Sequence, residues 1–158
     1  MSELDATDLR ILTVLQKEGR VTNAELSERV NLSPSACHRR VQRLEEEGYI
    51  KGYHADIDAR ELGFEVRVFA MVRLRSQAEV DLSAFEQRCR DWPLVRECHM
   101  LNGEIDFILK CVAPDLKTFQ AFVGELTGAP HVRNVKTSLT LRNSKDEAIV
   151  PLGETGGT

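Results

Sequence analysis

The sequence lacks a long hydrophobic run, a secretion signal and the common catalytic signatures. It has no apolar stretch of about 18 residues, so we expect no transmembrane helix and no membrane partner. Its first ten residues, MSELDATDLR, do not form a basic and then apolar signal, which favours a cytoplasmic protein. Glycine-rich phosphate loops, GxSxG and HExxH are all missing. We therefore expect a protein that is not an enzyme, although scattered histidines leave open an acid–base pair assembled by folding.

The four cysteines are also not arranged as a metal or disulfide framework. Cys37, Cys89, Cys98 and Cys111 form no CxxC pair, so reduced and packed thiols are predicted. Cys37 adjoins His38, but neighbours on a helix point about 100° apart, which disfavours a shared metal ion. We predict neither a metal nor a cofactor. Cys98 and Cys111 fall on two arms of a predicted hairpin, which leaves a redox pair as the alternative to packed thiols.

Aromatic residues are scarce, and the charge is unevenly distributed. The chain is 6% aromatic and 42% hydrophobic, with a net charge of −4, as in a globular protein with a modest core. Residues 29–44 nevertheless contain Arg29, Arg39, Arg40 and Arg43 and no acidic residue. A basic window of this kind inside an acidic chain is compatible with contacts to phosphates.

The first third of the chain has the pattern of three helices. Starts are predicted at Asp5-x-x-Asp8 and Thr22-x-x-Glu25, which resemble capping boxes, and at Ser33-Pro34. Gly19 is expected to end the first helix and Gly48 the third. Cys37, Val41 and Leu44 form the buried stripe of the third helix. A short helix, a tight turn and this helix make a helix-turn-helix.

The third helix is predicted to read DNA. Ser35, Arg39 and Gln42 lie opposite its buried stripe, where side chains reach base edges in the major groove. Arg40 and Arg43 are better placed for phosphates. The expected DNA-contacting set is Thr22, Asn23, Ser33, Ser35, His38, Arg39, Arg40, Gln42 and Arg43. The alternative is an ordinary solvated amphipathic helix.

The remaining sequence alternates strands and helices. Strands are predicted at 64–75, 95–101, 106–112 and 132–141, with the Asn102-Gly103 turn signal between the middle two. Helices fall between the other strands, so the order is βαββαβ, as in ferredoxin-like folds. The predicted class is α+β. The expected domains are a DNA-binding domain at 1–53, a linker at 54–63, a βαββαβ domain at 64–142 and a tail at 143–158.

One face of the predicted sheet has no covering helix. The first strand carries Phe69 and Met71 on one side and a Val/Ala/Leu row on the other. Neither side is polar enough to face water, so a homodimer through the uncovered face is expected. The alternative is that the tail segment 148–152 folds over that face.

Several segments together resemble the leucine-responsive/asparagine regulator (Lrp/AsnC) family of prokaryotic transcription regulators. They are LDATDLRIL at 4–12, GRVTNAELSERVNLSPSACHRRVQRLEEEGYIKGY at 19–53 and ECHMLNGEIDFILKC at 97–111. The resemblance implies a winged helix-turn-helix domain, an ACT-like sensing domain and dimers that assemble into octamers. It also implies a nucleoid-associated protein that binds double-stranded DNA and is modulated by an amino-acid effector.

The resemblance further implies an effector site at the turn after the second strand of the sensing domain. The implied residues are Met100, Leu101, Asn102, Gly103, Glu104, Asp106, Thr137 and Ser138. Asp106 is expected to pair with the ligand ammonium. Thr137 or Ser138 of a neighbouring subunit is expected near the carboxylate. Two alternatives for the whole protein stay open: an architectural DNA-binding protein without an effector, and a metabolite-sensing subunit that never binds DNA.

Overall fold

The structure is a computed structural model that describes residues 3–146 and 149–152. It divides into two compact units, one of Met1–Asp56 with Lys145–Thr158 and one of Ile57–Ser144. The chain passes from the first unit to the second at Asp56, inside the expected linker 54–63. Among the described helices, none is both long and apolar enough to cross a membrane.

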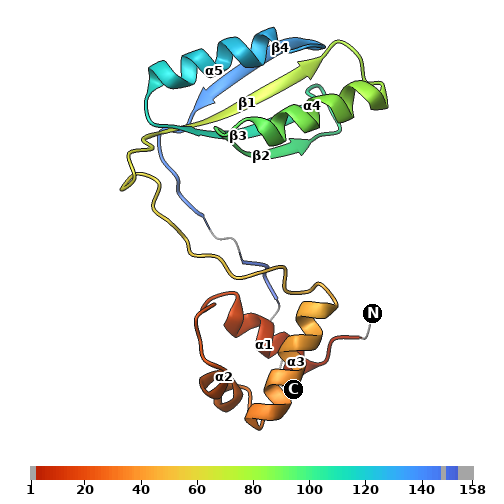
Figure 1. Cartoon of the computed structure of the whole chain (residues 1–158), viewed down its shortest axis with the longest axis vertical. Helices are drawn as coiled ribbons and strands as arrows, with labels where there is room; N and C mark the ends of the chain where they lie inside the picture. The colour runs from red at the N-terminus through yellow and green to blue at the C-terminus, as the bar shows by residue number, and fades with distance from the viewer. Residues whose placement is uncertain (1–2, 147–148, 153–158) are drawn as a thin grey trace. The chain divides into compact units, whose positions relative to one another are not determined.

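The N-terminal unit contains three helices, labelled in Figure 1. They are α1 (Ala6–Leu15), α2 (Asn23–Arg29) and α3 (Pro34–Glu46). Asp5 and Asp8 form a capping box at α1, Thr22 and Glu25 form one at α2, and Ser33 caps α3. All three predicted helix starts are therefore confirmed. Their small core consists of Ile11, Leu26, Val30, Cys37 and Leu44.

The helix ends agree with the sequence only in part. Helix α1 ends at Leu15 with Gln16 as its cap, so the prediction that Gly19 ends it is wrong. Gly48 follows α3 with a φ of +79°, a conformation that glycine adopts without strain, as predicted. The segment that follows is not paired into a strand between residues 50 and 57.

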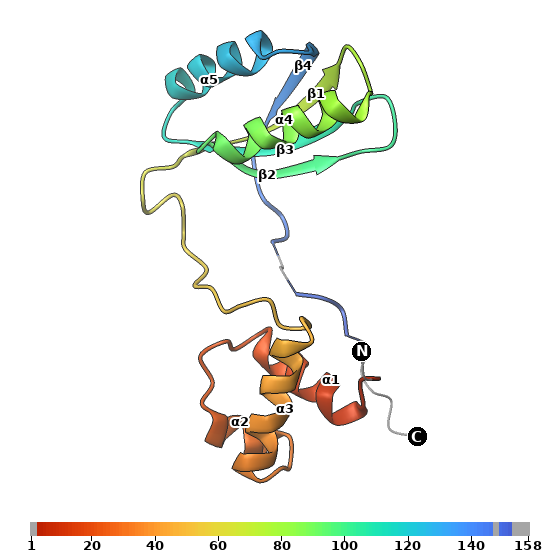
Figure 2. The same cartoon turned by 45° about the vertical axis from the view of Figure 1, so that its right-hand side comes forward.

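The C-terminal unit is a four-stranded antiparallel sheet covered by two helices (Figures 1 and 2). Its elements are β1 (Val66–Leu74), α4 (Glu79–Asp91), β2 (Val95–Met100), β3 (Phe107–Ala113), α5 (Leu116–Gly128) and β4 (Val132–Leu139). The strand order is β2-β3-β1-β4. The predicted ferredoxin-like βαββαβ plan is thus confirmed, with β4 ending at Leu139 instead of residue 141.

Both helices lie on the same side of this sheet, and their apolar residues form one core with it (Figure 2). On β1 the buried residues alternate with more accessible ones, so Val68, Ala70 and Val72 face the helices. Phe69 and Met71 point to the opposite face. The predicted division of β1 into two faces is confirmed, and no described segment of the unit covers the Phe69 side.

The connection between β2 and β3 is slightly longer than the predicted strand bounds 95–101 and 106–112 imply. Strand β2 ends at Met100 and β3 begins at Phe107, and the Leu101 N–H donates to the Asp106 carbonyl at 2.8 Å. The predicted hairpin is confirmed by the antiparallel pairing of Met100 with Phe107, and each predicted strand end differs by one residue. Gly103 does not have the positive φ of a two-residue type I′ turn.

The described part of the tail contacts the N-terminal unit. The Gln16 side-chain amide donates to the Val150 carbonyl at 3.0 Å and accepts from the Val150 N–H at 3.0 Å. This pairing places Val150 against α1, contrary to the alternative in which the tail covers the sheet. Ala148, which belonged to that expectation, lies outside the described residues.

Candidate functional site

Helix α3 presents a polar face of the expected composition. Cys37 and Leu44 are fully buried beneath it. The exposed residues on the other side include Ser35, His38, Arg39 and Gln42. The predicted orientation of α3 is confirmed, and its outer face carries hydrogen-bond donors of the kind that read base edges. Because Cys37 is buried while His38 is exposed, the two side chains do not converge.

A buried aspartate holds this helix against α1. The side chain of Asp8 is only 1% exposed. Its Oδ1 lies 2.8 Å from Arg40 Nη1, and its Oδ2 lies 2.6 Å from Arg43 Nη2. Arg40 Nη1 also lies 2.7 Å from Asp5 Oδ2. Two arginines of α3 are therefore bonded to carboxylates of α1 and its cap.

These contacts change the charge that the basic window presents. A third arginine, Arg29, pairs with Glu18 at 2.7 Å. The acids lie outside residues 29–44, so counting charges within that window overstates its free positive charge. Within the described part of the chain, Arg39 forms no ion pair, unlike the other three arginines of the window.

Three further residues of the expected DNA-contacting set form hydrogen bonds at the starts of α2 and α3. The Thr22 hydroxyl accepts from the Glu25 N–H, and the Ser33 hydroxyl accepts from the Ala36 N–H. The Asn23 amide donates to the Pro34 carbonyl at 2.9 Å, which joins the start of α2 to the start of α3. These residues position the two helices relative to each other.

The ion pairs lower the pKa values of both aspartates. The pKa of Asp5 falls to about 2, chiefly because its carboxylate accepts from the Asp8 N–H and also from Arg40. Burial acts to raise the pKa of Asp8, but hydrogen bonds from Arg40 and Arg43 outweigh it, so the pKa is lowered. Both groups are therefore ionised and paired at neutral pH.

Replacing Asp8 should destabilise the N-terminal unit. We expect Asp8→Asn to lower the free energy of unfolding by about 1–3 kcal/mol, because two guanidinium groups lose a charged partner. Urea denaturation followed by circular dichroism measures this. Glu18→Gln is the matched control, since it removes one charge from an exposed pair and should change stability little. Equal effects of the two variants would contradict a special role for Asp8.

The same variant has a defined pH dependence. Lowered pKa values contribute stability that is fully present above the unfolded value of 3.8 and is lost as the pH falls toward the folded values. The stability difference between the wild-type protein and Asp8→Asn should therefore shrink as the pH falls below 3.8. A difference that grows on acidification would contradict this assignment.

A second candidate site lies beside the β2–β3 connection. A pocket of about 250 Å³ is lined by Gln77, Leu82, Met100, Leu101, Asn102, Gly103 and Asp106. Five of these were expected from the sequence. Gln77, which precedes α4, and Leu82, on α4, were missed because only folding brings them to the β2–β3 connection.

Asp106 is the polar centre of this pocket. It is 5% exposed, and its Oδ2 accepts from the Leu74 N–H at 2.7 Å. Its Oδ1 accepts from the Gln77 amide at 2.9 Å. The backbone N–H of Asp106 donates to the Val72 carbonyl at 3.0 Å. One residue thus ties the end of β1 to the pocket.

The other expected effector residues lie outside the pocket. Glu104 is exposed, and it does not line the pocket. On β4, Thr137 pairs with Ala70 and Ser138 pairs with Phe69. Cross-strand partners share a face, so Thr137 points to the helix side and Ser138 to the open side of the sheet.

Both units match known protein families. A model described as winged helix-turn-helix DNA-binding matches residues 4–51. A model described as the Lrp/AsnC ligand binding domain matches residues 67–150. The first matched segment contains α3. The second contains every residue that lines the pocket beside Asp106.

Individual proteins are similar over almost the whole chain. A leucine-responsive regulatory protein of Rhizobium meliloti is 50% identical over 151 residues, covering 95% of this chain and 97% of the relative. A Bkd operon transcriptional regulator of Pseudomonas aeruginosa is 39% identical over 153 residues, covering 96% and 100%. Among solved structures, a Neisseria meningitidis transcriptional regulator in complex with L-Met has a TM-score of 0.90 and 38% identity, covering 95% and 97%.

Proposed function

Because the chain belongs to the Lrp/AsnC family of transcriptional regulators, we propose that α3 reads double-stranded DNA and that an amino acid bound beside Asp106 modulates this binding. The N-terminal unit is a DNA-binding winged helix-turn-helix domain, and the C-terminal unit is a ligand-binding domain. The observation that carries the proposal is that the family match and an accessible donor face coincide on α3.

Base reading is assigned to Arg39 and Gln42. Both are exposed on the face of α3 opposite Cys37 and Leu44. An arginine suits guanine and a glutamine suits adenine in the major groove. Arg40 and Arg43 are assigned to phosphates through their positive charge, which the carboxylates of Asp5 and Asp8 offset locally. This division of roles separates specific from non-specific binding.

Arg39→Ala tests the base-reading role. We expect specific DNA binding to weaken roughly 10- to 100-fold, with a smaller loss for non-specific DNA, because a bidentate base contact disappears. Titrations on the protein's own upstream region and on a scrambled duplex at one salt concentration measure both. Arg29→Ala removes the same charge from an arginine paired with Glu18 and is the matched control. An equal loss on both duplexes would show that Arg39 contacts only the backbone.

The pocket beside Asp106 suits a small amino acid. Its volume of about 250 Å³ lies below the range typical of drug-sized ligands. Leu82, Met100 and Leu101 provide apolar lining, and Asp106 supplies a carboxylate whose oxygens can each accept a further bond. This combination favours an amino acid with an apolar side chain and its ammonium toward Asp106. The L-Met complex of the similar Neisseria protein supports that class of ligand.

Asp106→Asn tests the ammonium contact. We expect amino-acid affinity to fall at least roughly tenfold, because a charge-assisted hydrogen bond is replaced by a neutral one. Isothermal titration with each amino acid, L-Met and L-Leu first, measures the affinity, and circular dichroism checks folding. Glu104→Gln is the control, since it removes one negative charge from an exposed residue outside the pocket.

Two results would contradict the pocket assignment. One is an equal loss of affinity in both variants, which would indicate a general electrostatic effect. The other is that no amino acid binds the wild-type chain. Gel shifts with each amino acid added then separate regulated from architectural DNA binding, because an architectural protein would bind equally well under every condition.

The open face of the sheet is assigned to a second copy of the chain. Phe69 is 36% exposed there, beside Met71 of the same strand. Charged side chains surround these apolar groups, including the Glu97–Lys110 pair at 2.7 Å. An apolar centre with a polar rim is typical of a protein interface. Such dimers are the building units of the octamer that the resemblance implies.

Phe69→Lys tests this interface. We expect the variant to dissociate into 17.8 kDa monomers, because a charge replaces the apolar centre. Sedimentation equilibrium of the full chain gives the mass directly. Val80→Lys, at a residue that is 73% exposed on α4, is the control and should keep the wild-type mass. A dimer that survives Phe69→Lys would place the interface elsewhere.

A further inference from the structure

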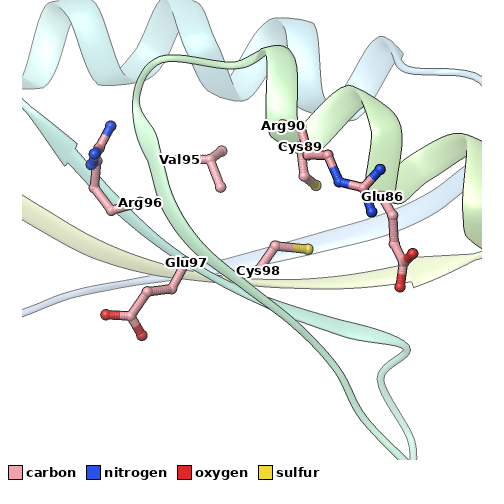
Figure 3. A pocket seen from close by; sticks show the side chains of 7 residues that line it. All are labelled: Glu86, Cys89, Arg90, Val95, Arg96, Glu97 and Cys98. Atoms are coloured by element: carbon pink, nitrogen blue, oxygen red, sulfur yellow. The ribbon is translucent and has the colours of Figure 1, made fainter. Parts of the chain in front are cut away.

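Two cysteines line a second pocket in the C-terminal unit, between α4 and β2 (Figure 3). The pocket has a volume of about 370 Å³, and its lining also includes Glu86 and Arg90. It shares no lining residue with the pocket beside Asp106. The proposed amino-acid and DNA functions do not use it.

The two sulfur atoms face each other across this space. Cys89 projects from α4 toward the sheet, and Cys98 lies on β2 opposite it (Figure 3). Because Cys98 pairs with the buried Leu109, its side chain is on the helix-covered face and away from the proposed dimer interface. Both side chains line the same pocket, which brings the two thiols close together. Both are free thiols.

The two partners differ in accessibility and in acidity. Cys89 is 4% exposed, whereas Cys98 is half-buried. The neighbouring Cys89 thiol lowers the pKa of the Cys98 thiol by acting as a donor toward it, and nearby Arg90 acts in the same direction, against burial and Glu86. Cys98 therefore forms the thiolate more readily than a cysteine without such a donor, and the thiolate is the reactive form.

The other two cysteines lack these features. Burial raises the pKa of Cys37, which lies in the core of the N-terminal unit. Burial also raises the pKa of Cys111 to about 12, and its side chain is fully enclosed beneath the helices. They provide internal references for reactivity within one chain.

We propose that Cys98 and Cys89 are a redox-reactive pair that a hydroperoxide converts into an intramolecular disulfide between β2 and α4. The Cys98 thiolate attacks the peroxide, the O–O bond breaks, and a sulfenic acid and an alcohol (or water) form after one proton is taken up. The Cys89 sulfur then attacks the sulfenic sulfur, the S–O bond breaks, and the hydroxyl leaves with the Cys89 proton as water. Two thiols are oxidised by two electrons, which the peroxide accepts.

This disulfide has a structural consequence. It would tie α4, which carries Leu82, to β2, which ends at Met100. Both residues line the pocket beside Asp106. Formation of the disulfide itself does not depend on the proposed function, because it is a property of the two thiols and their neighbours.

Peptide mapping of the full reduced chain tests the proposal. Trypsin cleaves after Arg88, Arg90, Arg96 and Lys110, so Cys89, Cys98 and Cys111 fall in three separate peptides. After brief treatment with hydrogen peroxide and alkylation with N-ethylmaleimide, we expect two of the four thiols to be lost. Peptide 89–90 should be linked to peptide 97–110, and dithiothreitol should reverse the link. Without peroxide, iodoacetamide should modify Cys98 about tenfold faster than Cys37 or Cys111.

Three variants separate the roles. Cys98→Ser should leave Cys89 reduced, and Cys89→Ser should stop at a Cys98 sulfenic acid that dimedone traps. Cys37→Ser is the matched control and should still form the disulfide. A link from Cys98 to Cys111, links only between chains, or equal reactivity of all four thiols in the folded chain would overturn the proposal. The wild-type map alone decides the matter if a variant fails to fold.

Discussion

A buried carboxylate needs hydrogen-bond donors, and this requirement organises both halves of the chain. Among the described residues, Asp8 and Asp106 are the two buried acidic side chains. Asp8 recruits Arg40 and Arg43 and so fastens α3 to α1. Asp106 recruits the Leu74 N–H and the Gln77 amide and so fastens the end of β1 to the segment before α4. Removing the Asp106 carboxylate would leave the buried Leu74 N–H unsatisfied, and removing the Asp8 carboxylate would take a charged partner from two guanidinium groups.

The Asp8 contacts also explain how an acidic chain can carry a helix-turn-helix whose third helix is proposed to read DNA. Arginines held by carboxylates keep α3 in place while contributing less free charge, so attraction to phosphate alone is modest. Arg39, without an ion pair among the described residues, extends from a helix that is already oriented. Preorganisation of this kind favours reading of bases over indiscriminate binding to the backbone. The charge that matters for recognition is therefore set by three-dimensional pairing, which whole-chain composition does not reveal.

Local signals predicted most of the fold, and long-range pairings were what they missed. Capping residues such as Thr22 and Ser33 act within four residues of themselves, and the alternation on β1 needs only one strand, so both were readable in sequence. The partners of Arg40 and of Asp106 are about 30 residues away, and no periodicity reports them. For the same reason the sequence paired Cys98 with Cys111 along one hairpin, whereas the fold sets Cys98 against Cys89 on the neighbouring helix.

Asp106 further suggests how a small ligand could act at a distance. Its side chain and backbone hold Leu74 and Val72, the last part of β1. The pairing of β1 with β4 is irregular between Arg73 and Leu74, so this end of the strand is held by the carboxylate where the regular ladder is interrupted. An ammonium group that engaged Asp106 would bind the same two oxygens that already hold Leu74 and Gln77. A change at this carboxylate would therefore act directly on the end of β1, whose open face carries Phe69. The ligand pocket therefore adjoins the end of the same strand whose middle carries the proposed dimer face, and this strand is the direct physical connection through which the two could be coupled.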